Sequence, residues 1–296
     1  MRVGSLLGVP VAVNPWFLVI LFLLATVGLL PQALVLFTSV FFHEFAHTLI
    51  ARTHGLRSSQ IELLPFGGVA SIDELGGLDP GLETSVALAG PVASGILAAV
   101  CWLIQNNWPL YPELVTYGIY SNLALAGFNL LPALPLDGGR LLRAHLAGKR
   151  GFRGATRAAL GLARILAVLL MVGGIIGLHL GALNISFPVV GVFLWLAARR
   201  EEYNSRYLFV QYITKRRQEL GTGGPKLVES ILCPASMPVK EVVRHFLPQN
   251  YHLVYLLGAN KELLGYVTEL EVIEAMLEKG IDTPLEALPV HPLGRE

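Results

Sequence analysis

The sequence predicts a mainly α-helical membrane protein, in which a bundle of about six transmembrane helices precedes a small α+β cytoplasmic domain. Of the 296 residues, 53% are hydrophobic and only 15% are charged, and the mean hydropathy of +0.58 exceeds that of soluble globular proteins. Residues 1–198 carry 18 charged side chains, whereas residues 199–296 carry 25. This shift predicts a membrane domain at residues 1–200, a linker at 201–225 and a soluble domain at 226–296.

Six apolar runs predict the transmembrane helices, each of which needs roughly 17 to 25 residues to cross the hydrocarbon core. Pro31 and Gln32 separate the first two runs. A cleaved signal peptide is the alternative for the first run, but a second apolar run follows at once, which favours a membrane span. The runs cover residues 15–30, 33–50, 84–105, 114–134, 165–183 and 185–198.

The charges predict how the chain lies in the bilayer. Lys and Arg side chains follow the second, fourth and sixth runs, and such connections stay in the cytoplasm, so both termini are expected there. The net charge is only +1, from 22 basic and 21 acidic residues, which predicts no nucleic-acid partner. Cys101 and Cys233 form neither a disulfide framework nor a zinc-binding motif.

The strongest chemical signal is the sequence His43-Glu44-Phe45-Ala46-His47 inside the second apolar run. Histidines four residues apart lie on one face of a helix, where two imidazole nitrogens can bind one zinc ion. Glu44 lies beside them and can accept a proton from a water molecule. Histidines that only hydrogen-bond to neighbouring helices are the alternative. Ionisable groups inside a membrane helix are costly and mark functional sites, which favours a metal centre.

Asp137 is the candidate third ligand, because zinc sites with an open coordination position commonly use three protein ligands. It follows the fourth run, where Pro132 and Pro135 are expected to break the helix. An ordinary Asp-Gly turn is the alternative. At 1.5 Å per residue, the histidines lie roughly 8 to 13 Å inside Arg52, and Asp137 lies about 5 Å inside Arg140. One ion can therefore join the two helices, and zinc is preferred although other divalent ions accept these ligands.

Four stretches together resemble the site-2 protease family of intramembrane zinc metalloproteases. They follow the family's order along the first 200 residues: HEFAH at 43–47, LPFGG at 64–68, AGP at 89–91 and NLLPALPLDGGR at 129–140. The short amino-terminal segment, the six runs and the EEYNSRYLFVQYITKRR passage into the tail more closely resemble the stage IV FB-type sporulation proteases of endospore-forming bacteria.

The resemblance implies a zinc site and a catalytic base, formed by His43, His47, Asp137 and Glu44. It also implies that Asn129 and Pro135 help to place the substrate strand or the oxyanion. In the sporulation group the protein substrate is the inactive precursor of a late sporulation sigma factor, and partner membrane proteins act as inhibitors. The resemblance then implies a multi-pass protein of a forespore membrane, with its termini on the mother-cell side.

Hydrolysis within a bilayer requires water and an unwound substrate, and the sequence predicts a means for each. The helix break at residues 132–139 and the loop at Gly67 and Gly68 can admit water. Extended backbone at residues 66–72 can pair with the substrate by strand addition. A simple cytoplasmic turn is the alternative for this loop.

The tail predicts a helix at 239–247, strands at 253–257 and 263–267, and a helix at 269–278, after a charged helix-like connector and a glycine-rich break at 221–225. This order resembles a single cystathionine-beta-synthase-type (CBS) repeat. Such repeats pair and can bind adenine nucleotides, which implies a homo-oligomer and candidate nucleotide contacts at Thr268 and Glu271. An inert docking domain is the alternative.

Two other classes of protein fit parts of the pattern. A nucleotide-regulated transporter or channel would use intramembrane carboxylates and histidines as relays, but it predicts paired broken helices where this sequence has one strong break. A catalytically inactive scaffold predicts a damaged motif, whereas Glu44 is present. The sequence therefore favours an intramembrane zinc endopeptidase that cuts near the cytoplasmic face.

Overall fold

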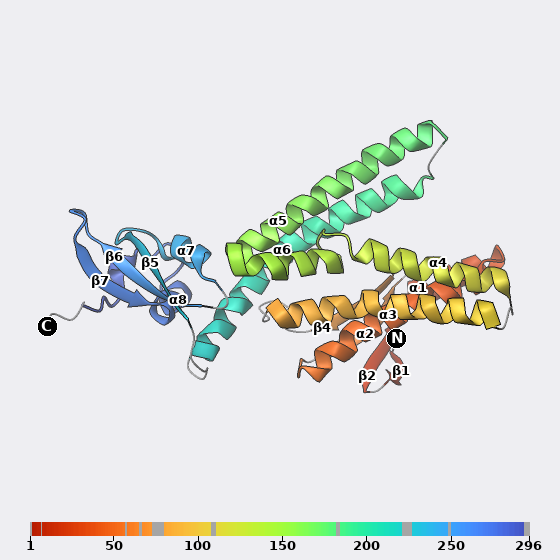
Figure 1. Ribbon diagram of the computed structural model, residues 1–296, viewed down its shortest axis with the longest axis horizontal. Coiled ribbons are helices and arrows are strands. Elements are labelled where there is room, and N and C mark those ends of the chain that lie inside the picture. Colours follow the sequence, from red (N-terminus) through yellow and green to blue (C-terminus); the bar gives the residue numbers. More distant parts are fainter. Residues whose placement is uncertain are drawn as a thin grey trace. The chain divides into compact units, whose positions relative to one another are not determined.

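The computed structural model describes residues 2–6, 8–56, 58–64, 67–72, 80–107, 111–181, 184–220, 227–247 and 250–292. The chain divides into two compact units, the first formed by residues 1–142 and 159–201 and the second by residues 143–158 and 202–296. The first unit is mainly helical, and the second combines helices with a small sheet (Figure 1). The predicted domain limits differ from these units mainly at residues 143–158, which group with the tail.

Each predicted apolar run overlaps a helix. The helices are α1 (Pro15–Thr26), α2 (Leu30–Thr53), α3 (Pro80–Asn107), α4 (Pro112–Asn129), α5 (Asp137–His179) and α6 (Ser186–Leu220). Within the described residues, α2, α3 and α5 are long and apolar enough to cross a membrane. The count of six spans stays a prediction.

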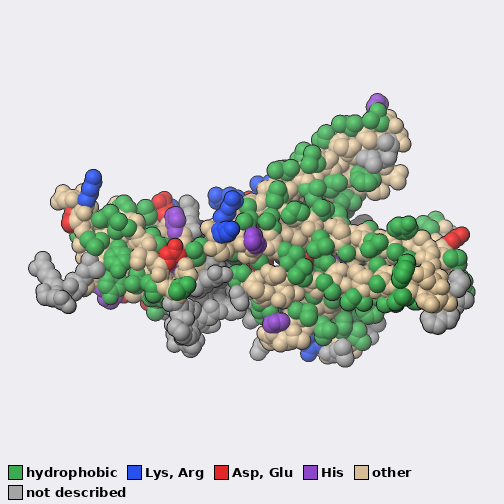
Figure 2. Space-filling model, in the orientation of Figure 1, with side chains coloured by type: hydrophobic (Ala, Val, Ile, Leu, Met, Phe, Trp, Pro, Cys, Tyr) green, Lys and Arg blue, Asp and Glu red, His purple; other side chains and the backbone are tan. Residues whose placement is uncertain are grey.

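The helices carry an apolar outer surface. Trp16, Phe22 and Leu169 are 70%, 69% and 64% exposed, and many other large apolar side chains are exposed beside them. Figure 2 shows apolar side chains spread across the visible surface of the helical part. A water-soluble protein rarely exposes so much contiguous apolar area, whereas lipid chains solvate it readily.

One predicted helix boundary is wrong, and one helix extends beyond its predicted run. The fourth helix ends at Asn129 and not at residue 134, because Pro132 and Pro135 cannot continue it. The fifth run, which starts at residue 165, begins inside α5, whose first residue is Asp137, since hydropathy marks only the apolar part of a helix whose first turns are charged. Gly151 interrupts α5 with a φ of 66°, a conformation that glycine adopts without strain.

A four-stranded sheet in the first unit has the order β1-β2-β3-β4, with strands β1 (Arg2–Leu6), β2 (Val9–Val13), β3 (Ser58–Leu64) and β4 (Gly67–Ile72). β2 and β3 are parallel, and the outer pairs are antiparallel. The extended backbone that the sequence predicted at residues 66–72 is confirmed at residues 67–72, which form β4. Residue 66 lies outside the described part. The other three strands were not predicted, because short strands inside apolar sequence give no separate periodicity signal.

A buried polar pair links two helices of the bundle. The Asn122 amide of α4 donates to the Ser39 hydroxyl of α2 at 2.8 Å, and both side chains are buried. Hydrogen bonds of this kind stabilise helix pairs in apolar surroundings. The pair fixes α4 beside α2, one helical turn before His43.

The second unit contains β5 (Val228–Pro234), α7 (Val239–Val242), β6 (Tyr251–Leu257), β7 (Leu263–Thr268) and α8 (Glu269–Glu278). β5 and β6 are parallel, and β6 and β7 are antiparallel. The strands predicted at 253–257 and 263–267 and the helix predicted at 269–278 are confirmed as β6, β7 and α8. The helix predicted at 239–247 is shorter and ends at Val242, and the sequence did not predict β5. The helix-like connector is also confirmed, as the end of α6; the break predicted at 221–225 lies outside the described residues.

The core of the second unit includes one side chain from α5. Phe152 is buried among tail residues such as Val239, Val254 and Ile273, and the Arg143 guanidinium lies 5.3 Å from the centre of its ring. Sequence patterns gave no sign of this packing, because Phe152 precedes the tail by about 75 residues. The core of the second unit therefore includes a residue from outside the tail sequence.

We expect Phe152→Ala to destabilise the second unit by about 3–5 kcal/mol, the usual cost of removing a buried phenylalanine side chain. Limited proteolysis of the full chain in detergent should then cut residues 227–292 faster than in the unsubstituted chain. Leu227→Ala is the control, because Leu227 is 78% exposed in the same unit. Equal cleavage rates for the two variants would contradict a packing role for Phe152.

Candidate metal centre

Helix α2 presents its two histidines on one face. His43 and His47 are 2% and 6% exposed, and their rings lie 4.9 Å apart with an interplanar angle of 82°. They are four residues apart in a continuous helix, which places one above the other as the motif predicts. Both imidazoles point away from the lipid-facing surface and into the bundle.

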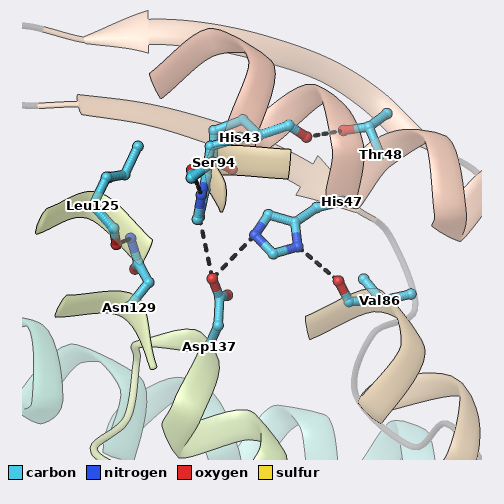
Figure 3. A network of polar contacts seen from close by, with 9 residues as sticks. His43, His47, Thr48, Val86, Ser94, Leu125, Asn129 and Asp137 are labelled. Carbon is cyan, nitrogen blue, oxygen red and sulfur yellow. Dashed lines mark hydrogen bonds and ion pairs between the residues drawn. The ribbon is translucent and has the colours of Figure 1, made fainter. Parts of the chain in front are cut away.

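Asp137 completes the cluster from the first residue of α5. Its Oδ2 atom lies 3.2 Å from His43 Nε2 and 3.1 Å from His47 Nε2 (Figure 3). The carboxylate is buried. Within the described residues, His43, His47 and Asp137 form a cluster whose possible ligand atoms all lie within 4.8 Å of one another, close enough to bind one metal ion. The sequence predicted that the three would meet, across 94 and 90 residues of chain.

The geometry of these atoms fits a zinc ion. Ligand atoms at 2.0–2.1 Å from a tetrahedral zinc are separated from one another by about 3.3 Å. The two Nε2–Oδ2 separations of 3.2 and 3.1 Å are close to this value. Two histidines and one carboxylate are also the donor set of a hydrolytic zinc site, which leaves the fourth position for water. His43, His47 and Asp137 are therefore candidate zinc ligands.

Helix α3 contacts the Nδ1 atom of each histidine. His47 Nδ1 lies 2.7 Å from the carbonyl oxygen of Val86, and His43 Nδ1 lies 2.9 Å from the Ser94 hydroxyl (Figure 3). Gly90 lies between Val86 and Ser94 on this helix, and a Cβ atom at Gly90 would come within 2.2 Å of His47 Nε2. Gly90 belongs to the AGP stretch at 89–91, but no sequence pattern indicates a role for it, for Val86 or for Ser94.

Glu44 lies in reach of the same centre. Its carboxylate is partly buried and interacts electrostatically with both histidines, Asp137 and Arg140. A Cβ atom at Gly68 would come within 2.8 Å of Glu44 Cγ, so the backbone of β4 passes directly against this side chain. Within the described residues β4 pairs only with β3, so it is an edge strand of the sheet.

Two of the other candidate substrate residues, Asn129 and Pro135, lie at the break between α4 and α5, and Gly67 lies in the sheet. Asn129 is the last residue of α4, and its amide nitrogen donates to the Leu125 carbonyl at 3.0 Å (Figure 3). Pro135 lies two residues before Asp137. Gly67 begins β4 and pairs with Leu64. A substrate-binding role for these three residues stays a prediction.

Thr268 and Glu271 of the tail form a helix cap. The Thr268 hydroxyl accepts from the Glu271 backbone N–H at 3.3 Å, and the Glu271 carboxylate accepts from the Thr268 backbone N–H at 2.7 Å. Burial acts to raise the pKa of Glu271, but the hydrogen bonds from Thr268 and His291 outweigh it, so this pKa is lowered. The structure gives both side chains a capping role, and nucleotide binding by them stays a prediction.

A buried set of two histidines and a carboxylate, with a glutamate beside it and lipid-facing helices around it, defines a membrane-embedded metallohydrolase. The chain matches the model of peptidase family M50 at residues 31–109 and 106–173. It belongs to this family, the site-2 protease family of intramembrane zinc metalloproteases, and is an integral membrane protein. Family membership favours the protease over the transporter and scaffold alternatives.

Three similar proteins show the extent of the likeness. The chain is 31% identical to the zinc metalloprotease MJ0392 of Methanocaldococcus jannaschii, over 90% of this chain and 77% of that protein. It is 28% identical to the stage IV sporulation protein FB of Bacillus subtilis, over 80% of each chain. A solved structure of the site-2 protease from Methanocaldococcus jannaschii matches with a TM-score of 0.53 and 31% identity, over 68% of this chain and 94% of that one.

Proposed function

We propose that this protease hydrolyses a membrane-associated protein at a zinc ion held by His43, His47 and Asp137, near the cytoplasmic face. The observation that carries the proposal is the convergence of three ligand atoms from α2 and α5, with separations of 3.1 and 3.2 Å between each histidine and the carboxylate. A bound zinc ion supplies the positive charge that acidifies a water molecule and polarises the scissile carbonyl.

Glu44 is the proposed general base. Its carboxylate takes the proton that is released when water attacks the carbonyl carbon. It returns this proton to the amide nitrogen as the carbon–nitrogen bond breaks, so that an amine and a carboxylate leave. The position of Glu44 next to His43 on α2, with its side chain against β4, supports this role.

The edge of β4 that does not pair with β3 is the proposed binding surface for the substrate backbone. A helical substrate hides its carbonyl groups in hydrogen bonds, whereas a strand added to β4 presents them. The close approach of Gly68 to Glu44 supports this proposal, because a strand paired there lies beside the catalytic base. Asn129 and Pro135, at the break before Asp137, are the proposed residues that orient the scissile carbonyl.

The narrower proposal for the substrate is the precursor of a late sporulation sigma factor. The similarity to the stage IV sporulation protein FB over 80% of both chains supports it, as does the resemblance of the passage into the tail. Inhibition by membrane proteins and a location in the forespore membrane belong to the same proposal. The chain is about as similar to MJ0392 as to the sporulation protein. A test of the narrower substrate therefore includes a second, unrelated membrane-tethered protein.

The topology and the tail complete the proposal. We infer six passes with both termini in the cytoplasm, supported by the cations after the second, fourth and sixth runs. The β–α–β–β–α order of the second unit supports a CBS-like regulatory domain that pairs with a second copy. Adenine nucleotide binding at Thr268 and Glu271 requires those side chains to exchange their capping contacts for the ligand.

We expect the purified chain to bind about one zinc ion and Asp137→Ala to bind almost none, because two imidazoles alone do not complete the site. The experiment measures zinc content together with cleavage of a membrane-tethered sigma factor precursor and of an unrelated tethered protein. Asp282→Ala is the control, since Asp282 is an exposed tail aspartate paired with Lys240. Full zinc content in Asp137→Ala would refute the ligand set, and equal cleavage of both proteins would refute the narrower substrate.

A further inference from the structure

Ser94 is a hydroxyl residue at the centre of an apolar helix, and it is fully buried. Its Oγ atom lies 2.9 Å from His43 Nδ1, the nitrogen on the opposite side of the ring from Asp137. Buried hydroxyl groups in apolar surroundings are costly unless they are hydrogen-bonded. The position of Ser94 is therefore explained by its contact with the histidine.

Ser94 belongs to a face of α3 that serves the metal centre along its length. Val86, Gly90 and Ser94 follow one another at intervals of four residues, so they lie on the same side of the helix. Val86 offers its carbonyl oxygen to His47, Gly90 gives both imidazoles room, and Ser94 offers its hydroxyl to His43. Each histidine thus has one partner from α3 on Nδ1 and faces Asp137 with Nε2.

The two partners differ in what they impose on the imidazole. A carbonyl oxygen only accepts hydrogen bonds, so Val86 requires the proton of His47 to be on Nδ1 and leaves Nε2 with its lone pair free. A serine hydroxyl can accept or donate. His43 has Nε2 available for a metal only while the Ser94 hydroxyl accepts the hydrogen bond from Nδ1–H. The state of His43 as a ligand thus depends on one side chain.

We propose that Ser94 is a positioning residue for His43, which fixes its ring orientation and its tautomer for metal binding. The inference rests on the proposed function, since it takes His43 as a zinc ligand. Partners on the far nitrogen of a ligating histidine typically change metal affinity by about 10- to 100-fold when they are removed. Ser94 is buried against the far nitrogen of His43, so its effect acts through that ligand.

The test is the zinc dissociation constant of the purified full chain, measured by competition with a chelator. Ser94→Ala should raise this Kd by about 10- to 100-fold, whereas Ser94→Thr, which keeps the hydroxyl, should restore most of the affinity. Ser85→Ala is the matched control, because Ser85 is an exposed serine of the same helix whose hydroxyl bonds only to the Gly81 carbonyl in the described contacts. With cobalt in place of zinc, the visible absorption of Ser94→Ala should also shift, since the geometry around the ion changes.

An unchanged Kd and an unchanged cobalt spectrum in Ser94→Ala would overturn the proposal. If Ser94→Ala does not fold, Ser94→Cys replaces it, because sulfur keeps the volume but accepts weakly; an unchanged Kd there overturns the proposal equally. Failure of the proposed function is a separate result, since the unsubstituted chain would then bind no stoichiometric zinc. Cleavage by Ser94→Ala should recover at saturating zinc, which a defect in folding would not allow.

Discussion

Glu44→Gln should lower the rate of substrate cleavage by about 10²- to 10⁴-fold while zinc remains bound, the usual effect of removing a general base. Glutamine has the size of glutamate, so the packing against Gly68 persists. Its amide cannot take a proton from water near neutral pH, so the water loses its base. The three candidate ligands are unchanged, and zinc content should match that of the original chain.

The measurement compares cleavage of a membrane-tethered substrate with zinc content in the same preparation. Glu113→Gln is the control, because Glu113 is an exposed acidic residue in the first turn of α4. Cleavage by Glu44→Gln at the original rate would rule out Glu44 as the base. Loss of zinc in this variant would instead show that Glu44 helps to hold the metal.

Gly90→Ala should remove zinc binding altogether. The added Cβ atom would lie 2.2 Å from His47 Nε2 and 2.7 Å from His43 Nε2, so both imidazoles must leave the positions from which they face Asp137. Alanine forms helices better than glycine by about 1 kcal/mol, and forcing a methyl group into a packed site costs about 1–3 kcal/mol. Helix α3 should therefore persist while the metal centre does not.

The control for this variant is Gly95→Ala in the same helix, where a Cβ atom meets no atom within 4 Å. Zinc content and helical circular dichroism are measured for both variants. We expect both to keep their helical signal and only Gly95→Ala to keep its zinc. Stoichiometric zinc in Gly90→Ala would mean that the histidines are placed differently from this structure.

The candidate ligands of the metal centre were predictable from the sequence, because local sequence patterns mark them. The spacing of His43 and His47 follows from the helical repeat, and an acidic residue beside two prolines at the end of an apolar run identified Asp137. The contacts of Ser94 and Val86 were not predictable. A serine in an apolar helix has no pattern of its own, and a backbone carbonyl exists at every residue.

The fold shows the same division. Composition by itself predicted that apolar helices dominate the first 200 residues and that the tail forms a separate domain, because hydropathy and charge are averages over a segment. Only the tertiary structure decided that β1 to β3 form a sheet, that α5 begins at Asp137 and that Phe152 enters the core of the tail. It also decided which helix supports the histidines, through contacts that span 39 and 51 residues. Such contacts depend on how whole helices pack, and the shape of a packed interface is a property of both partners that neither segment encodes alone.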